Sequence, residues 1–179
     1  MLNKIPVVGF VAPSGTGKTT LLRKLIPLLR DAGLRVAAIK HTHHPFEMDK
    51  PGKDSYELRQ AGAGQMLVAS NRRWALLVEN PQSEPEPSLG ELLTHIDQDK
   101  ADIILVEGFK HEHFPKIELH RAATDAELWF PTDEDIIAIA TDEPLQEARH
   151  LPQLNINVAG EVCHFLIQYF QLAQGGINV

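Results

Sequence analysis

The stretch that decides the fold lies near the N-terminus, at residues 9–20, and reads Gly9-Phe10-Val11-Ala12-Pro13-Ser14-Gly15-Thr16-Gly17-Lys18-Thr19-Thr20. An apolar run over residues 5–11 leads into this small, glycine-rich turn, and a leucine-rich segment follows it. Strand, loop and helix in that order form the context that a phosphate-binding P-loop requires. The stretch therefore predicts a binding site for a nucleoside triphosphate.

The residue types in the loop fit that chemistry. Gly15 and Gly17 have no Cβ, so the backbone can curl and turn several N–H groups inward around a polyphosphate. The first turn of the following helix adds unpaired N–H groups and the positive end of its dipole. We expect Lys18 to reach the β- and γ-phosphates and the Thr19 hydroxyl to ligate Mg²⁺. The predicted nucleotide contacts in the loop are Ser14, Gly15, Thr16, Gly17, Lys18, Thr19 and Thr20.

The rest of the chain alternates apolar strands with helical segments. Leucines recur at helical spacing after the loop, and Gly33 is placed to cap that helix in a left-handed conformation. A second helix is expected to start with a capping box formed by Asp54 and Glu57, and a third to run from Ser88 to about Asp97. Near the end, an amphipathic pattern predicts a terminal helix over residues 162–170. The expected strands cover residues 35–41, 66–70, 74–79, 102–107, 116–119, 135–140 and 154–158.

This order of elements predicts an α/β fold of the P-loop NTPase-like kind. The sheet is expected to be open, twisted and mostly parallel, with helices on both faces and a small hairpin formed by the strands at 66–70 and 74–79. Neither an internal repeat nor a second-domain boundary is visible, so residues 1–179 are expected to form a single nucleotide-binding domain.

Composition narrows the class of function. A formal net charge of −7 argues against a dedicated nucleic-acid binder, which normally carries a basic stripe. No apolar stretch is long enough to span a bilayer, and the N-terminus passes straight into the first strand without a signal-peptide pattern. The single cysteine, Cys163, excludes an internal disulfide and a zinc site built from several cysteines. We therefore expect a cytoplasmic protein that binds neither nucleic acid nor membrane.

Acidic residues at two strand ends are further candidates for the site, because ligands bind at the carboxyl ends of parallel strands. Glu107 ends an apolar strand downstream of the P-loop, which is the position of a residue that holds Mg²⁺ or orients the attacking water. Its alternative role is to cap the turn before Gly108. Asp142 follows another strand, and its carboxylate can accept bonds from the N1–H and amino group of guanine, which selects GTP. Helix capping is the equally plausible alternative for Asp142.

Two loop features complete the set of candidates. His41, His43 and His44 lie within four residues, and neutral imidazole is a common metal ligand. More typically such groups add donors to a phosphate-rich pocket, or belong to a solvated loop. Asp49, in the polar segment that follows, is a possible further Mg²⁺ contact of the kind that switch loops supply.

Four blocks of this sequence are distinctive when taken together: residues 9–20, Ile39-Lys40-His41-Thr42-His43-His44, residues 49–59 from Asp49 to Arg59, and Leu105-Val106-Glu107-Gly108-Phe109-Lys110. With these blocks the chain resembles the molybdopterin-guanine dinucleotide biosynthesis protein B family, and the resemblance covers nearly the whole chain. In that family Ala12 is the usual residue of the loop, although the general P-loop pattern has glycine there.

The resemblance implies a homodimeric GTP-binding adaptor with weak GTPase activity. Its partner would be the molybdenum cofactor guanylyltransferase that joins GMP to molybdopterin, and its cofactors would be GTP and Mg²⁺. The family's P-loop residues carry over to Gly15, Gly17, Lys18 and Thr19, and its acidic strand-end residue carries over to Glu107.

Two other functions remain open at this point. The first is a small-molecule kinase, which needs arginines that close on the phosphates, and Arg72, Arg73 and Arg121 form no obvious lid. The second is a non-catalytic metal-handling module, which would use His41, His43 and His44.

Overall fold

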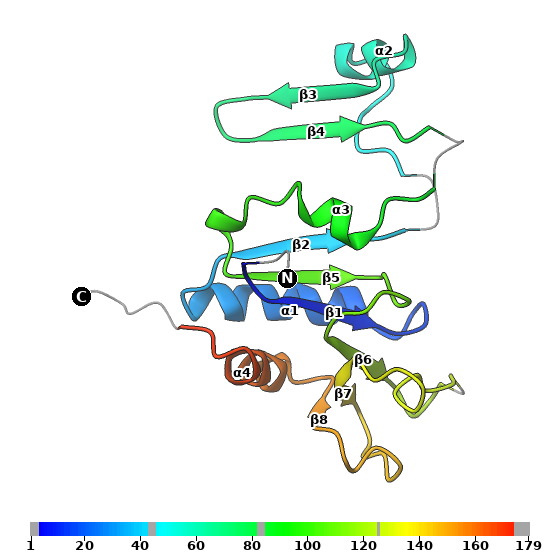
Figure 1. Ribbon diagram of the computed structural model, residues 1–179, viewed down its shortest axis with the longest axis vertical. Coiled ribbons are helices and arrows are strands. Elements are labelled where there is room, and N and C mark those ends of the chain that lie inside the picture. The colour runs from blue at the N-terminus through cyan, green and yellow to red at the C-terminus, as the bar shows by residue number, and fades with distance from the viewer. Residues whose placement is uncertain (1–3, 43–45, 82–84, 125, 174–179) are drawn as a thin grey trace, which may run out of the picture. The chain divides into compact units, whose positions relative to one another are not determined.

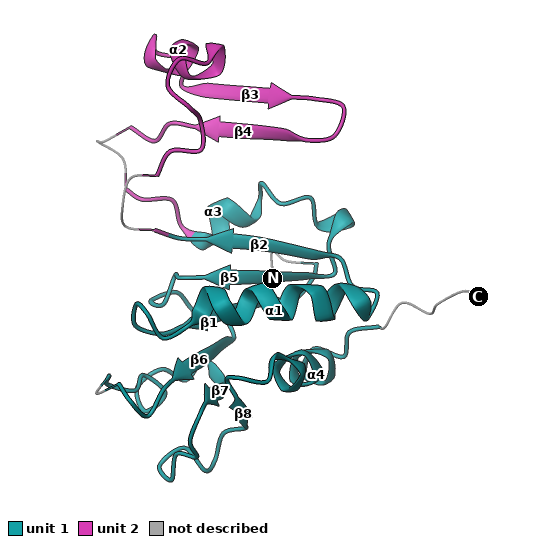
Figure 2. Cartoon of the chain, turned by 180° about the vertical axis from the view of Figure 1, so that it is seen from behind, with its two compact units in different colours: residues 1–41, 89–179 teal, residues 42–88 magenta. Residues whose placement is uncertain are grey.

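The computed structural model describes residues 4–42, 46–81, 85–124 and 126–173, arranged in two compact units. The first unit comprises Met1–His41 with Leu89–Val179, and the second comprises Thr42–Ser88 (Figure 2). That the two units act as one nucleotide-binding domain stays a prediction.

The first unit contains β1 (Val7–Val11), α1 (Lys18–Asp31), β2 (Val36–Lys40), α3 (Leu89–Leu93), the 3₁₀ helix η1 (Gln98–Lys100), β5 (Ile103–Glu107), β6 (Lys116–His120), β7 (Ile136–Thr141), β8 (Gln153–Asn155) and α4 (Ala159–Tyr169).

The first unit is built on a six-stranded sheet in the order β2-β5-β1-β6-β7-β8. Every pairing in this sheet is parallel, and Figure 1 shows the arrowheads of β1, β2 and β5 pointing the same way. The carboxyl ends of all six strands therefore meet at one edge, which is where open α/β sheets bind ligands. The predicted open parallel fold is confirmed.

Packing against the two faces of the sheet explains which side chains the strands bury. On one face, Leu21, Leu25 and Leu29 of α1 recur at helical spacing and are at most 2% exposed, and α4 packs beside them. In Figure 2, α1 lies in front of the sheet. On the other face, Leu89 and Leu93 of α3 pack against a second apolar cluster. Burying one such leucine stabilises the fold by about 1.5–3 kcal/mol. Helices thus cover both faces, as predicted.

The end of α1 also follows the prediction from sequence. Gly33 has φ 86°, its N–H bonds to the carbonyl of Arg30 at 2.9 Å, and the N–H of Leu34 bonds to the carbonyl of Leu29 at 3.0 Å. This pair of bonds closes the helix and turns the chain towards β2.

Three local expectations were wrong. Helix α2 (Asp54–Gln60) is capped by the backbone of Lys53 without any side-chain cap, so Asp54 lies inside the helix and forms no capping box with Glu57. Asp54 instead sits in the first turn, where a carboxylate favours the helix dipole. Helix α3 has only five residues, because the chain leaves the helical path after Leu93 and forms η1. Strand β8 ends at Asn155, three residues before the expected end at Val158, although the N–H of Ile156 still donates to the carbonyl of Thr141 at 3.0 Å.

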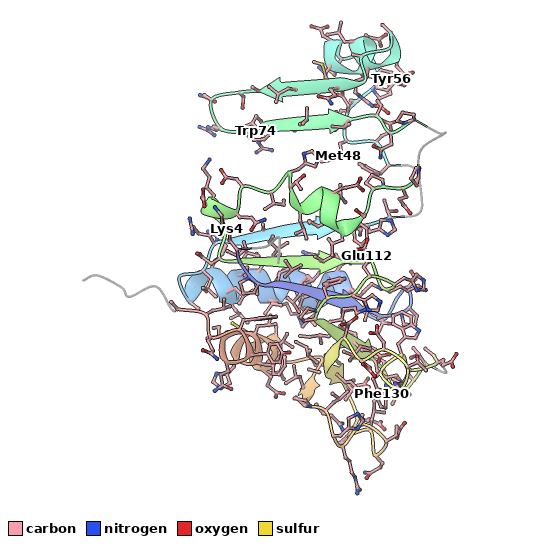
Figure 3. The ribbon with its side chains drawn as sticks, in the orientation of Figure 1. Lys4, Met48, Tyr56, Trp74, Glu112 and Phe130 are labelled. Atoms are coloured by element: carbon pink, nitrogen blue, oxygen red, sulfur yellow. The ribbon has the colours of Figure 1, made fainter. Side chains whose placement is uncertain are left out.

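The second unit is small and contains α2 and the predicted hairpin. Strands β3 (Gln65–Ala69) and β4 (Trp74–Val78) pair antiparallel, with Leu67 opposite Leu76. Residues opposite each other share a face, so one face of the hairpin carries Leu67, Leu76, Trp74 and Val78. All four are exposed, by 58%, 40%, 67% and 46% respectively. Figure 3 labels Trp74 at the start of β4.

Candidate functional site

The loop between β1 and α1 has the shape that a phosphate cradle needs. Gly15 and Gly17 adopt φ 84° and 110°, which is the left-handed region that side chains disfavour. A Cβ on Gly15 would meet no atom within 4 Å, so the backbone conformation alone calls for glycine at that position. Thr16 is buried between them, and its hydroxyl donates to the carbonyl of Pro13 at 3.0 Å. Ser14, Gly15, Thr19 and Thr20 are exposed.

Lys18 begins helix α1, and its side chain turns back over the loop. The Nζ group donates to the carbonyls of Ala12 at 2.7 Å and Pro13 at 3.0 Å. Burial lowers the pKa of this ammonium, the nearby carboxylate of Glu107 raises it, and the charge of Lys40 lowers it. Lys18 is therefore a partly desolvated cation at the opening of the loop, where its ammonium could bind a phosphate.

Glu107 lies next to the loop because β5 pairs with β1 in parallel register, with Glu107 opposite Phe10. Its carboxylate oxygens both lie 3.5 Å from the hydroxyl of Thr19, and one of them lies 3.6 Å from Nζ of Lys40. The Glu107 side chain is only 15% exposed. A hydroxyl and a carboxylate side by side supply the hard oxygen ligands that Mg²⁺ prefers. Thr19 and Glu107, which were each predicted as Mg²⁺ contacts, thus lie side by side, and their role as metal ligands stays a prediction.

A tight turn after β5 holds Glu107 in this position. Gly108 has φ 107°, and a Cβ there would lie 2.7 Å from Cβ of His41. The N–H of His41 donates to the carbonyl of Glu107 at 2.8 Å, and the imidazole packs on the ring of Phe109 with centroids 4.5 Å apart. His41 thus supports the turn that follows Glu107.

The predicted histidine cluster can be followed only in part. His43 and His44 lie outside the described residues. Among the residues that the structure does describe, no group of three or more histidine, cysteine, aspartate or glutamate side chains is placed to hold a metal ion.

Asp142 lies at the end of β7 with both carboxylate oxygens engaged. Oδ1 accepts the backbone N–H of Ala122 at 2.9 Å, and Oδ2 accepts from Nη1 of Arg121 at 3.2 Å. The backbone bond from Ala122 is the main cause that lowers the pKa of this carboxyl, opposed by desolvation and helped by Arg121. Asp142 is therefore ionised and held in place at the carboxyl edge of the sheet.

Asp49 belongs to the second unit, where its carboxylate organises the local chain. Oδ1 accepts from the N–H of Lys50 at 2.9 Å and from the hydroxyl of Ser55 at 3.1 Å, while Oδ2 lies 3.8 Å from Nε of Arg59. Arg59 also pairs with Glu47 and Glu79. These contacts give Asp49 a structural role in the second unit, and its role as an Mg²⁺ ligand stays a prediction.

Arg121 is the residue at this edge that the sequence did not single out for the site. It follows the last residue of β6, and its Nε donates to the carbonyl of Thr16 in the loop at 3.0 Å. Its Nη2 donates to Oδ1 of Asn157 at 3.1 Å. The signal that could have identified it is its position directly after a parallel strand, the same rule that selected Glu107 and Asp142.

A cavity of about 530 Å³ is lined mainly by the segments that precede β6 and β7, and none of the predicted site residues lines it. The buried Lys116 forms part of its wall, and its Nζ lies 2.8 Å from Oδ2 of Asp133. The lining residues are Lys110, His111, His113, Lys116, Trp129, Thr132, Asp133, Glu134 and Asp135.

A profile of the family described as "MobB: Molybdopterin guanine dinucleotide synthesis protein B" matches residues 7–142. A protein of Escherichia coli K12 named molybdopterin-guanine dinucleotide biosynthesis adapter protein is 49% identical over 96% of this chain and 97% of its own length. A protein of the same name from Haemophilus influenzae is 43% identical over 93% of this chain and 90% of its own length.

Solved structures of similar shape belong to the same kind of protein. A crystal structure of molybdopterin-guanine biosynthesis protein B superposes with a TM-score of 0.71 and 22% identity, over 92% of this chain and 99% of that one. A homologue from Bacillus stearothermophilus gives a TM-score of 0.68 and 24% identity, over 92% of this chain and 97% of that one. At these identities the structures support the fold. Within the described residues, none of the helices has both the length and the apolarity needed to cross a membrane.

Proposed function

The chain belongs to the molybdopterin guanine dinucleotide synthesis protein B family and acts as an adaptor in that synthesis, and we propose that it does so by binding GTP with Mg²⁺. One observation carries the proposal. The glycine-rich loop, Lys18, Thr19 and Glu107 come together at the carboxyl edge of the sheet, with the loop opening at the start of a 14-residue helix. We expect hydrolysis at this site to be slow, as the weak GTPase activity implied by the family resemblance suggests.

Each group in the site has a distinct task in holding the nucleotide. Backbone N–H groups of the loop and the first turn of α1 surround the phosphates, and the Lys18 ammonium exchanges its carbonyl partners for phosphate oxygens. Thr19 and Glu107 would hold Mg²⁺ directly or through water. The metal, when bound, neutralises charge on the phosphate oxygens. Glu107 also orients the attacking water.

Selection of GTP over ATP is assigned to Asp142. Its carboxylate already accepts two hydrogen bonds, from Ala122 and Arg121, so a guanine edge would share or replace one of them. The test is thermal stability and calorimetry with GTP, GDP and ATP in the presence of Mg²⁺, because a bound ligand stabilises the folded protein by mass action. Asp142→Ala is expected to lower the ratio of GTP to ATP affinity. An unchanged ratio would show that another group reads the base.

The partner that fits the family is the guanylyltransferase that attaches GMP to molybdopterin. We expect the protein to co-purify with that enzyme and to raise its yield of the dinucleotide when GTP is limiting. Lys18→Ala separates the two halves of the proposal, since it is expected to remove nucleotide binding while changing a single side chain of the loop. If the Lys18→Ala protein supported the enzyme as well as the wild type, the adaptor would not work through bound GTP.

A homodimer is supported by the exposed apolar face of the hairpin, formed by Leu67, Trp74, Leu76 and Val78. An isolated two-stranded hairpin is marginally stable in water, and a contiguous apolar surface of this kind marks an interface. Trp74→Lys is expected to convert a dimer into a monomer in sedimentation velocity. Val158→Lys, at an exposed apolar residue of the first unit, is the matched control and should leave the dimer intact. A wild-type protein that sediments as a monomer at high concentration would count against the dimer.

A further inference from the structure

Arg121 connects the phosphate loop to the ends of three strands. Its guanidinium donates to the carbonyl of Thr16 in the loop, to the carboxylate of Asp142 after β7 and to the amide oxygen of Asn157 after β8. Arg121 itself follows β6. The side chain is 33% exposed, and Nε, Nη1 and Nη2 each have a separate acceptor. Arginine suits such a position because its planar guanidinium presents several donors in fixed directions.

The contact with Thr16 sets the direction of a backbone N–H in the loop. All described peptide bonds are trans, and in a trans peptide the carbonyl of one residue and the N–H of the next point in opposite directions. A guanidinium that holds the Thr16 carbonyl therefore turns the Gly17 N–H away from itself. Glycine suits position 17 because of its φ of 110°, while a Cβ there would only be in ordinary contact with Nη2 of Arg121, at 3.8 Å.

Asp142 in turn fixes the guanidinium. One of its carboxylate oxygens accepts from the Arg121 side chain and the other from the N–H of the next residue, Ala122. The aspartate thus clamps both the strand end that carries Arg121 and the charged group itself. A substitution of Asp142 would therefore affect the loop through the side chain of Arg121.

We infer that Arg121 is a positioning residue that pre-orients the phosphate loop and makes triphosphate binding depend on Asp142. This inference rests on the proposed function and extends it, because it gives Asp142 a second role that does not involve a base. Binding is tighter when a loop is already in its bound conformation, since less ordering remains to be done on association. Without Arg121, the carbonyl of the Thr16–Gly17 peptide loses the hydrogen bond from Nε that holds its orientation.

The test uses inorganic triphosphate with Mg²⁺, which has phosphates and no base, beside GTP in calorimetry. Loss of a hydrogen bond to a charged group corresponds to roughly a tenfold change or more in a binding constant. Arg121→Gln is expected to weaken triphosphate binding by about tenfold. Arg121→Lys should come within about threefold of the Gln variant, because lysine keeps the charge but lacks the planar fork. Arg149→Gln, at an exposed arginine of the same unit, should change nothing.

Asp142→Asn supplies the decisive measurement. Its amide would place N–H donors or a neutral oxygen against the guanidinium, so we expect affinity for inorganic triphosphate to fall by about three- to tenfold although that ligand has no base. In the Arg121→Gln background the same change should have little further effect, because the two residues act as one unit. Thermal unfolding of each variant verifies that the fold is kept. If Arg121→Gln does not fold, Arg121→Lys and Asp142→Asn still decide the matter.

Three outcomes separate the possibilities. Unchanged triphosphate affinity in Asp142→Asn, with only GTP affinity reduced, would overturn the inference and leave Asp142 as a reader of the base. Wild-type affinity in Arg121→Lys would overturn it too, since charge alone would then suffice. A wild-type protein that binds neither triphosphate nor GTP would instead overturn the proposed function, and this inference with it.

Discussion

The Thr19 hydroxyl lies 3.5 Å from each carboxylate oxygen of Glu107, although the two residues are 88 positions apart in the sequence. Parallel pairing of β1 with β5 produces this proximity, because it brings the end of β5 level with the start of the loop after β1. The hydroxyl and the carboxylate together form the proposed Mg²⁺ site. The nearby Lys40 ammonium, 3.6 Å from Glu107, balances its charge.

Glu107→Gln is expected to remove most of the Mg²⁺ dependence of GTP binding. The substitution keeps the size of the side chain and removes the charge that holds a hard cation. The measurement is the ratio of GTP affinities with and without Mg²⁺, which should fall by about tenfold or more, as for loss of a charged interaction. Glu147→Gln, at an exposed carboxylate of the same unit, is the control. A ratio that stays at the wild-type value would remove Glu107 from the metal site.

Lys18→Ala is expected to weaken GTP binding by at least about 30-fold, because a charge-assisted bond to phosphate contributes about 2 kcal/mol or more. Titration calorimetry or a fluorescent GTP analogue gives the affinity. Lys24→Ala changes an exposed lysine on the same helix and should bind as the wild type does. GTP affinity that survives the loss of Lys18 would place the phosphates somewhere other than the loop.

Gly108→Ala is expected to destabilise the fold, by at least about 1–2 kcal/mol for the left-handed backbone alone. The new methyl group would also lie 2.7 Å from Cβ of His41. Gly160→Ala is the matched control, because Gly160 lies inside α4 and a Cβ there meets no atom within 4 Å. We expect that substitution to stabilise by about 0.5–1 kcal/mol. Chemical denaturation of the two variants measures both effects, and a Gly108→Ala protein as stable as the wild type would contradict the tight turn.

Asp102→Asn tests a pH-dependent contribution to stability. The carboxylate of Asp102 accepts from Nε and Nη2 of Arg35, and these side-chain bonds are the main cause that lowers its pKa. A group whose pKa is lower in the folded state stabilises the fold above its unfolded pKa of about 3.9, and that contribution disappears as the pH falls through the folded value. The variant should therefore melt below the wild type at pH 7, and the gap should narrow below about pH 4. A gap independent of pH would show that charge on Asp102 contributes little.

Much of the fold could be read from the sequence because its signals are local. The glycine-rich loop, the leucine spacing of α1 and the buried run of β5 each specify one element within a short window. Helix α3 was predicted too long, since a cap at Ser88 and a few apolar residues do not reveal where packing against the sheet ends. The local pattern likewise predicted Asp54 as the N-cap of α2. In the structure Lys53 occupies the N-cap position, and Asp54 is the first residue of the helix.

The sequence by itself determined a phosphate loop, because small residues and one lysine at fixed spacing suffice to shape it. The sequence did not determine strand order and register, since strand pairing depends on contacts between residues far apart in the chain. Only the tertiary structure therefore decided that Glu107 faces Thr19 and that Arg121 joins Thr16 to Asp142. It also showed that Asp49 is engaged with Ser55 and Arg59 in the second unit, an attachment that no local pattern around Asp49 encodes.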